Sequence, residues 1–136
     1  MCCFTDFKEA KVAEEEITVY KVFAFNKKTG NYFPPFYNCN SYDKKVELGA
    51  ILCDKKFERE PSFGEVIFGL HSYEHLEDAI EIKHFLNLEE EVLGELELNP
   101  RIAKCKILPS YLHFKGKTDS GADCYCSNKL KVEQFL

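Results

Sequence analysis

Residues Phe68–Glu81, FGLHSYEHLEDAIE, decide the predicted fold, because a strand pattern and a helix pattern meet inside them. The run of apolar residues up to Phe68 predicts a strand that ends there, and Gly69 predicts a turn. Ser72 is a residue type that favours the N-cap of a helix, and apolar residues follow it at helical spacing. We therefore predict a strand, a glycine turn and a helix that starts at Ser72, with His71 just ahead of that helix.

Strand patterns lie on both sides of this stretch. The segment ITVYKVFAF at residues 17–25 is apolar on both faces, which is typical of a central strand. The segment RIAKCKIL at residues 101–108 alternates apolar and basic residues, which indicates a half-buried strand. Further strands are predicted at residues 46–53, 65–68, 111–115, 122–127 and 129–135, while residues 88–98 fit either a helix or a strand. The pattern predicts an α+β fold with six or seven mostly antiparallel strands and one main helix packed on the sheet.

The length of 136 residues predicts one domain, with residues 1–16 as an N-terminal arm and residues 17–136 as a single α+β domain. The seven cysteines, without a signal-peptide pattern or a long apolar run, indicate a protein of the cytoplasm with no membrane anchor. The net charge of −5 makes duplex nucleic acid an unfavourable main partner, since phosphate backbones reward excess lysine and arginine.

The stretch Phe68–Glu81 also contains a short pattern that is typical of certain zinc enzymes. His71, Glu74 and His75 spell H-x-x-E-H, in which two histidines one helical turn apart bind zinc and the glutamate activates water. The predicted helix start at Ser72 leaves His71 outside the helix. We therefore favour a turn histidine and a surface histidine over a catalytic zinc site.

A structural metal site is the other metal hypothesis. Its candidate ligands are Cys105, His113, Cys124 and Cys126. The C-x-C spacing places two thiols on one face of a strand, whereas structural zinc sites usually space cysteines by two to four residues. We predict buried thiols, no bound metal and no cofactor.

An aromatic, proline-containing segment, YFPPFY at residues 32–37, is the main candidate for a contact surface. Its two prolines lack backbone N–H donors, so the segment is predicted to be a sheet edge or a loop. Such a segment either packs over the core, which is the favoured interpretation, or presents exposed aromatic side chains that favour contacts with another protein. The residues predicted to bind a partner are Tyr32, Phe33, Phe36, Tyr37 and His71.

Three segments resemble a diffuse group of small uncharacterised proteins from bacteriophages, large DNA viruses and bacteria. They are TVYKVF at residues 18–23, GLHSY at residues 69–73 with EDA at residues 77–79, and AKCKI at residues 103–107 followed by CYCSNK at residues 124–129. The resemblance spans about residues 17–135. It implies an architecture and a viral or mobile-element setting, and it implies no activity.

A more distant similarity is to ADP-ribosyltransferase-like folds, which open with a tyrosine-bearing strand and close on strands with an acidic residue. This similarity implies a nucleotide-handling enzyme with His71, Tyr73 and Glu133 as its catalytic residues. No complete catalytic set occurs in the sequence, so whether the protein is an enzyme stays open.

The leading functional prediction is a viral or mobile-element accessory protein that acts by binding another protein. The alternatives are an enzyme centred on the His71 turn and a small virion or structural component. The sequence specifies neither the partner nor the oligomeric state.

Overall fold

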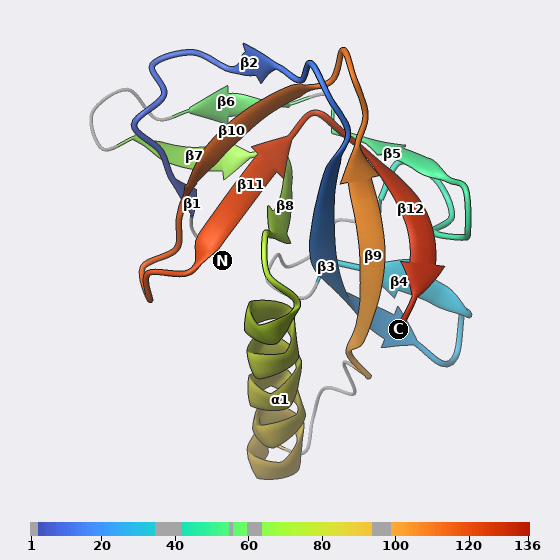
Figure 1. Ribbon diagram of the computed structural model, residues 1–136. Helices are drawn as coiled ribbons and strands as arrows, with labels where there is room; N and C mark the ends of the chain where they lie inside the picture. The colour runs from blue at the N-terminus through green and yellow to red at the C-terminus, as the bar shows by residue number, and fades with distance from the viewer. Residues whose placement is uncertain (1–2, 35–41, 55, 60–63, 94–98) are drawn as a thin grey trace.

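The computed structural model describes residues 3–34, 42–54, 56–59, 64–93 and 99–136. Within these residues twelve strands form one antiparallel sheet, and one helix, α1 (Leu76–Leu93), follows the eighth strand. Figure 1 shows that the sheet is strongly curled and that α1 extends from one end of it. The described part of the helix contacts β9, β3 and β8, which are neighbours in the sheet, so α1 packs against these three strands.

The strands are, in chain order, β1 (Cys3–Phe4), β2 (Lys11–Val12), β3 (Ile17–Asn26), β4 (Asn31–Phe33), β5 (Ile51–Cys53), β6 (Glu58–Arg59), β7 (Glu65–Phe68), β8 (Leu70–Tyr73), β9 (Arg101–Ile107), β10 (Leu112–Lys117), β11 (Asp123–Ser127) and β12 (Lys129–Phe135). Their order across the sheet is β5-β12-β9-β3-β8-β11-β10-β1-β7-β6. Strand β2 pairs with β10, and strand β4 pairs with β3. Two of the first sixteen residues form β1 and two form β2, so the predicted N-terminal arm contributes to the sheet.

Strand β3 is central, as its two apolar faces predict. It pairs with β9 from Ile17 opposite Ile107 to Phe23 opposite Arg101. On its other side it pairs with β8 at one position only, Tyr20 opposite Tyr73. The sheet is therefore continuous between β3 and β9 and narrowly joined between β3 and β8.

The buried side chains form three groups. The largest lies around β3, β9 and β12 and includes Val19, Phe23, Cys105, Leu130 and Val132. A second group lies between β1, β7, β10 and β11 and consists of Cys3, Val66, Phe114, Cys124 and Cys126. The third joins α1 to the sheet and consists of Val22, Tyr73, Ala79, Leu86 and Ile102. Burial of such apolar area is the main force that holds the curled sheet together and holds α1 against it.

The predicted α+β fold with six or seven strands is wrong. The described residues form twelve strands and a single helix of 18 residues, so the fold is closer to all-β. Five of the strands, β1, β2, β4, β5 and β6, are only two or three residues long. Such short strands show no alternation in the sequence, because alternation needs at least four residues to be visible.

The predicted helix start at Ser72 is also wrong. Residues Leu70–Tyr73 form β8, in which all four side chains are buried, and α1 begins at Leu76. Ser72 therefore lies inside the sheet, opposite Tyr125 of β11. The strands predicted at residues 17–25, 65–68, 101–108, 111–115, 122–127 and 129–135 are confirmed to within two residues at each end, whereas residues 46–53 form a strand only at Ile51–Cys53.

In the described residues, α1 has too many charged side chains and too little apolar length to cross a membrane.

Candidate functional site

His71 is buried in β8 and is not part of an exposed turn. Its side chain is 6% exposed, and its Nε2–H donates to the carbonyl of Val66 over 3.0 Å. Its Nδ1 lies 4.0 Å from the Sγ of Cys126 on the neighbouring strand β11. The imidazole is thus enclosed by β7 and β11, and it offers no surface to a partner protein.

Lys21 is the buried cation next to His71. Its Nζ donates to the backbone carbonyl of His71 over 2.6 Å, at the place where β3 and β8 share a single backbone pair. The rings of Phe23 and Tyr42 each lie 5.8 Å from this ammonium group, close enough for cation–π attraction. Lys21 therefore joins β3 to β8 by a side-chain hydrogen bond.

Burial and charge shift the pKa values of this group. Burial lowers the pKa of Lys21 to about 8, although the thiols of Cys105 and Cys126 and the carboxylate of Asp54 partly oppose that shift. Burial, and secondly the charge of Lys21, lower the pKa of His71 to about 4. Burial likewise raises the pKa of the Cys105 thiol to about 12. At neutral pH the lysine carries the charge, while the histidine and the thiol are neutral.

The three residues implied by the ADP-ribosyltransferase similarity do not meet. His71 and Tyr73 both lie on β8, but the Tyr73 ring belongs to the buried group under α1, where burial raises its pKa. Glu133 lies on β12, which β9 and β3 separate from β8. Its carboxylate pairs instead with Lys131 over 3.6 Å.

Of the predicted aromatic contact residues, Tyr32 and Phe33 lie on β4, and Phe36 and Tyr37 lie outside the described residues. Tyr32 is half-buried and stacks on Phe135 with ring centroids 5.0 Å apart. Its hydroxyl accepts a hydrogen bond from Arg101 over 3.0 Å. The ring therefore covers the core beside β9, and its hydroxyl reaches the surface.

The four candidate metal ligands do not converge. Cys105 belongs to the buried group around β3 and β9, and Cys124 and Cys126 belong to the group between β1 and β11. His113 lies on β10, where its ring is next to Phe7 and Tyr125, and burial lowers its pKa.

The H-x-x-E-H pattern is split between a strand and the segment before α1. His71 is buried, whereas the Nε2 of His75 lies 3.5 Å from Glu74 and 3.3 Å from Asp123. Among the described residues, these last three are the only set of three or more metal-ligand types whose ligand atoms lie close together. Both carboxylates also pair with lysines, Glu74 with Lys115 and Asp123 with Lys117. The group is therefore an exposed ion-pair network.

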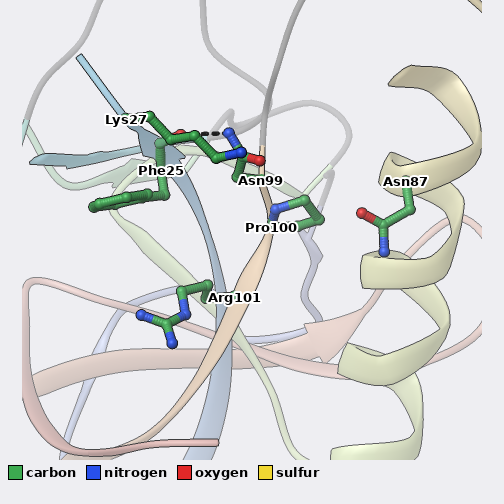
Figure 2. A pocket seen from close by; sticks show the side chains of 6 residues that line it. All are labelled: Phe25, Lys27, Asn87, Asn99, Pro100 and Arg101. Atoms are coloured by element: carbon green, nitrogen blue, oxygen red, sulfur yellow. Dashed lines mark hydrogen bonds between the residues drawn. The ribbon is translucent and has the colours of Figure 1, made fainter. Parts of the chain in front are cut away.

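An open pocket of about 370 Å³ lies where the far part of α1 faces the ends of β3 and β9. Figure 2 shows its six lining residues: Phe25 within β3 and Lys27 just after it, Asn87 on α1, Asn99 and Pro100 just before β9, and Arg101 at the start of β9. The side-chain amide of Asn99 donates to the carbonyl of Phe25 over 3.3 Å. That bond ties the segment before β9 to the end of β3 and so holds two of the lining residues together.

The pocket combines positive charge, amide groups and an aromatic ring. Its six lining residues carry two positive charges, from Lys27 and Arg101, and no negative charge, although the net charge of the chain is −5. Arg101 is oriented by its bond to the Tyr32 hydroxyl, which uses one of its five N–H donors. The arrangement is suited to an anionic group attached to an apolar or planar group.

No protein-family model, curated protein or solved structure matches this chain.

Sequence reasoning missed the pocket because its residues come from three separate segments. One local signal existed: Asn99 and Pro100 mark a break between the helix pattern and the strand at residues 101–108. Lys21 had a clearer signal, since it is a charged residue between Val19 and Phe23 on one apolar strand face.

Proposed function

We propose that this protein is a binding module that recognises an acidic segment of another protein in the pocket formed by Phe25, Lys27, Asn87, Asn99, Pro100 and Arg101 (Figure 2). The observation that carries the proposal is that two cations, two amides and an aromatic residue line one open pocket. Guanidinium and ammonium groups bind carboxylates, and amides pair with peptide backbone groups. In this proposal the pocket is the site at which the other protein binds.

The surroundings of the pocket favour a peptide over a smaller ligand. Asn87, His84 and Ile80 are three, four and seven positions apart on α1, so they lie on one helix face. The Ile80 side chain is 51% exposed and extends this face with an apolar contact. A nucleotide is usually enclosed by its site, whereas this pocket is open.

The aromatic segment at residues 32–37 takes part through its first residue. Tyr32 packs against Phe25, with ring centroids 4.9 Å apart, and also holds Arg101. Tyr32 therefore contacts both the Phe25 ring and the Arg101 guanidinium group of the pocket. In this proposal Tyr32 positions the binding residues, and His71 has no part in binding.

The resemblance to phage and large-virus proteins supports a viral or mobile-element accessory protein as the setting, with the cytoplasm of the host cell as its location. We propose a host or viral protein with an acidic, partly apolar segment as its partner.

The test is an NMR titration of the uniformly labelled protein with a short peptide of alternating glutamate and leucine. We expect shifts at the backbone amides of Lys27, Asn99 and Arg101. Lys27→Glu should weaken binding roughly tenfold or more, since it replaces an attractive charge with a repulsive one. Lys28→Glu is the matched control, because Lys28 is exposed, adjacent and outside the pocket, and it should change affinity by less than about twofold.

Two outcomes oppose the proposal. Equal weakening by Lys27→Glu and Lys28→Glu would show a diffuse charge effect, and unchanged amide shifts at the pocket would show that the pocket does not bind acidic peptides. If adenosine diphosphate moves these amides and the peptide does not, the pocket is a nucleotide site and the enzyme alternative gains support.

A further inference from the structure

Two thiols from opposite parts of the chain lie unusually close together. The Sγ of Cys124 on β11 lies 2.9 Å from the Sγ of Cys3 on β1, with Cys124 as the donor. The other sulfur contacts in the described residues are longer, at 3.6 to 4.0 Å. Both side chains are fully buried.

The backbone between the two cysteines explains the close approach. Strand β10 lies between β1 and β11, and the residue of β10 opposite Cys124 is Gly116. A β-carbon at this glycine would overlap the backbone carbonyl of Phe4 and would lie 3.2 Å from the Sγ of Cys3. The missing side chain therefore lets β1 approach β10 and lets the thiols meet above the glycine.

We propose that Cys3 and Cys124 are a redox-active pair that forms a disulfide when the protein meets a peroxide. The sulfurs need to approach by less than 1 Å, since a disulfide bond is about 2.05 Å long. The Cys124 proton already points toward Cys3, so Cys3 is assigned as the attacking sulfur and Cys124 as the resolving thiol.

The chemistry balances with hydrogen peroxide as the oxidant. The Cys3 sulfur, as thiolate, attacks one peroxide oxygen, the O–O bond breaks, and the departing hydroxide takes up the released proton as water. The Cys124 sulfur then attacks the sulfenic sulfur of Cys3, the S–S bond forms, the S–O bond breaks, and the hydroxyl leaves as water with the Cys124 proton. Two thiols are oxidised to one disulfide, and one peroxide is reduced to two waters.

Access to the buried pair depends on β1. This strand has only two residues, and strands that pair so briefly open more readily than long strands. In the closed state the hydrogen bond to Cys3, and secondly burial, keep the pKa of Cys124 above its usual value, so the closed pair reacts slowly. The disulfide would then fasten β1 to β11 and prevent that opening.

The experiment oxidises the full chain carrying Cys2→Ser, because Cys2 adjoins Cys3 and would blur the assignment. Reduced protein is treated with hydrogen peroxide, remaining thiols are blocked with N-ethylmaleimide, and the unreduced digest is examined by tandem mass spectrometry. Fragment ions must separate Cys124 from Cys126, since both lie in one tryptic peptide. We expect a cross-link between Cys3 and Cys124 and a melting temperature that rises by roughly 5–15 °C, reversed by dithiothreitol.

The control is Cys53→Ser, which removes a half-buried thiol outside this pair and should leave the cross-link unchanged. Cys124→Ala should abolish both the cross-link and the temperature shift, and the measurements on the Cys2→Ser protein stand even if this variant folds poorly. Full labelling of Cys3 and Cys124 by the maleimide after peroxide treatment and unfolding would overturn the proposal, as would a cross-link to Cys126.

Discussion

Lys21 and His71 place a charged and a neutral ionisable group side by side in the interior. The ammonium group makes a 2.6 Å bond to the His71 carbonyl, so the cation is positioned by the backbone of the same residue whose ring burial, and secondly this cation, keep neutral. Protonation of His71 would bury a second positive charge next to the first. The structure around β3 and β8 is therefore most stable while the imidazole is unprotonated.

This arrangement predicts a loss of stability in mild acid. The pKa of His71 is about 4 in the folded protein and 6.5 ordinarily, so the unfolded chain binds a proton that the folded chain refuses between these values. The contribution of the neutral His71 to the free energy of unfolding is therefore fully present above pH 6.5. It falls as the pH drops toward 4, by up to roughly 3 kcal/mol. Urea unfolding at a series of pH values measures this slope.

His71→Gln should remove most of the slope, because glutamine does not titrate, and the lowered pKa of the partly buried His113 accounts for a smaller slope that remains. The matched control is His84→Gln, which changes an exposed histidine on α1 and should leave the slope as it is. Parallel stability curves for wild type and His71→Gln across this pH range would contradict the argument.

At the scale of elements, the sharp change of direction between β7 and β8 depends on Gly69. Its φ is +138°, a conformation that residues with a side chain rarely adopt. A β-carbon there would overlap the Sγ of Cys126 and would lie 2.9 Å from the Phe57 ring. The glycine lets β7 pair with β1 and lets β8 pair with β11 across a single residue.

Gly69→Ala should therefore lower the free energy of unfolding by about 3 kcal/mol or more, from backbone strain together with overpacking. Gly121→Ala is the control: its φ is +89°, but the space around it is open, so only the backbone strain of about 1 kcal/mol applies. Denaturant unfolding of both variants gives the comparison. Similar losses would mean that the contacts with Cys126 and Phe57 relax at little cost.

The same glycine marks the limit of what the sequence could predict. The long strands were predictable, because β3, β9 and β12 each carry a pattern of seven or more residues. At Gly69 a turn was predicted correctly, but Ser72 looked like a helix cap, since a cap and a buried strand serine differ only in tertiary contacts. The pocket was out of reach for a related reason: Lys27, Asn87 and Arg101 converge only once β3, α1 and β9 are placed.

For the whole molecule, the N-terminal segment joins two parts of the sheet. Strand β1 pairs with β7 on one side and with β10 on the other. Thr5, which follows it, receives a second set of bonds: its N–H donates to Gly64 over 2.9 Å and its hydroxyl donates to Lys115 over 2.6 Å. The first residues thus hold the β6–β7 end of the sheet to the rest.

Thr5→Val should lower the free energy of unfolding by about 2 kcal/mol, because it removes a buried hydroxyl that also accepts from the N–H of Phe7. Hydrogen exchange should accelerate at the backbone amides of β7 and stay slow in β3 and β9. Thr18→Val, at an exposed position on β3, should change stability by no more than about 0.5 kcal/mol. Uniformly faster exchange in all three strands would argue against a local role for Thr5.

The pairing of β1 with β10 has a consequence for how the chain folds. Phe4 lies opposite Lys117 and Ile17 lies opposite Ile107, so the central ladders join residues about a hundred positions apart. Closing such large loops costs entropy before any contact forms, which makes folding slow, in the range of milliseconds to seconds. On the ribosome, β1 and β3 would emerge well before their partners. Until then their apolar side chains have no sheet to join, and such exposed apolar surface and unpaired strand edges are prone to aggregate.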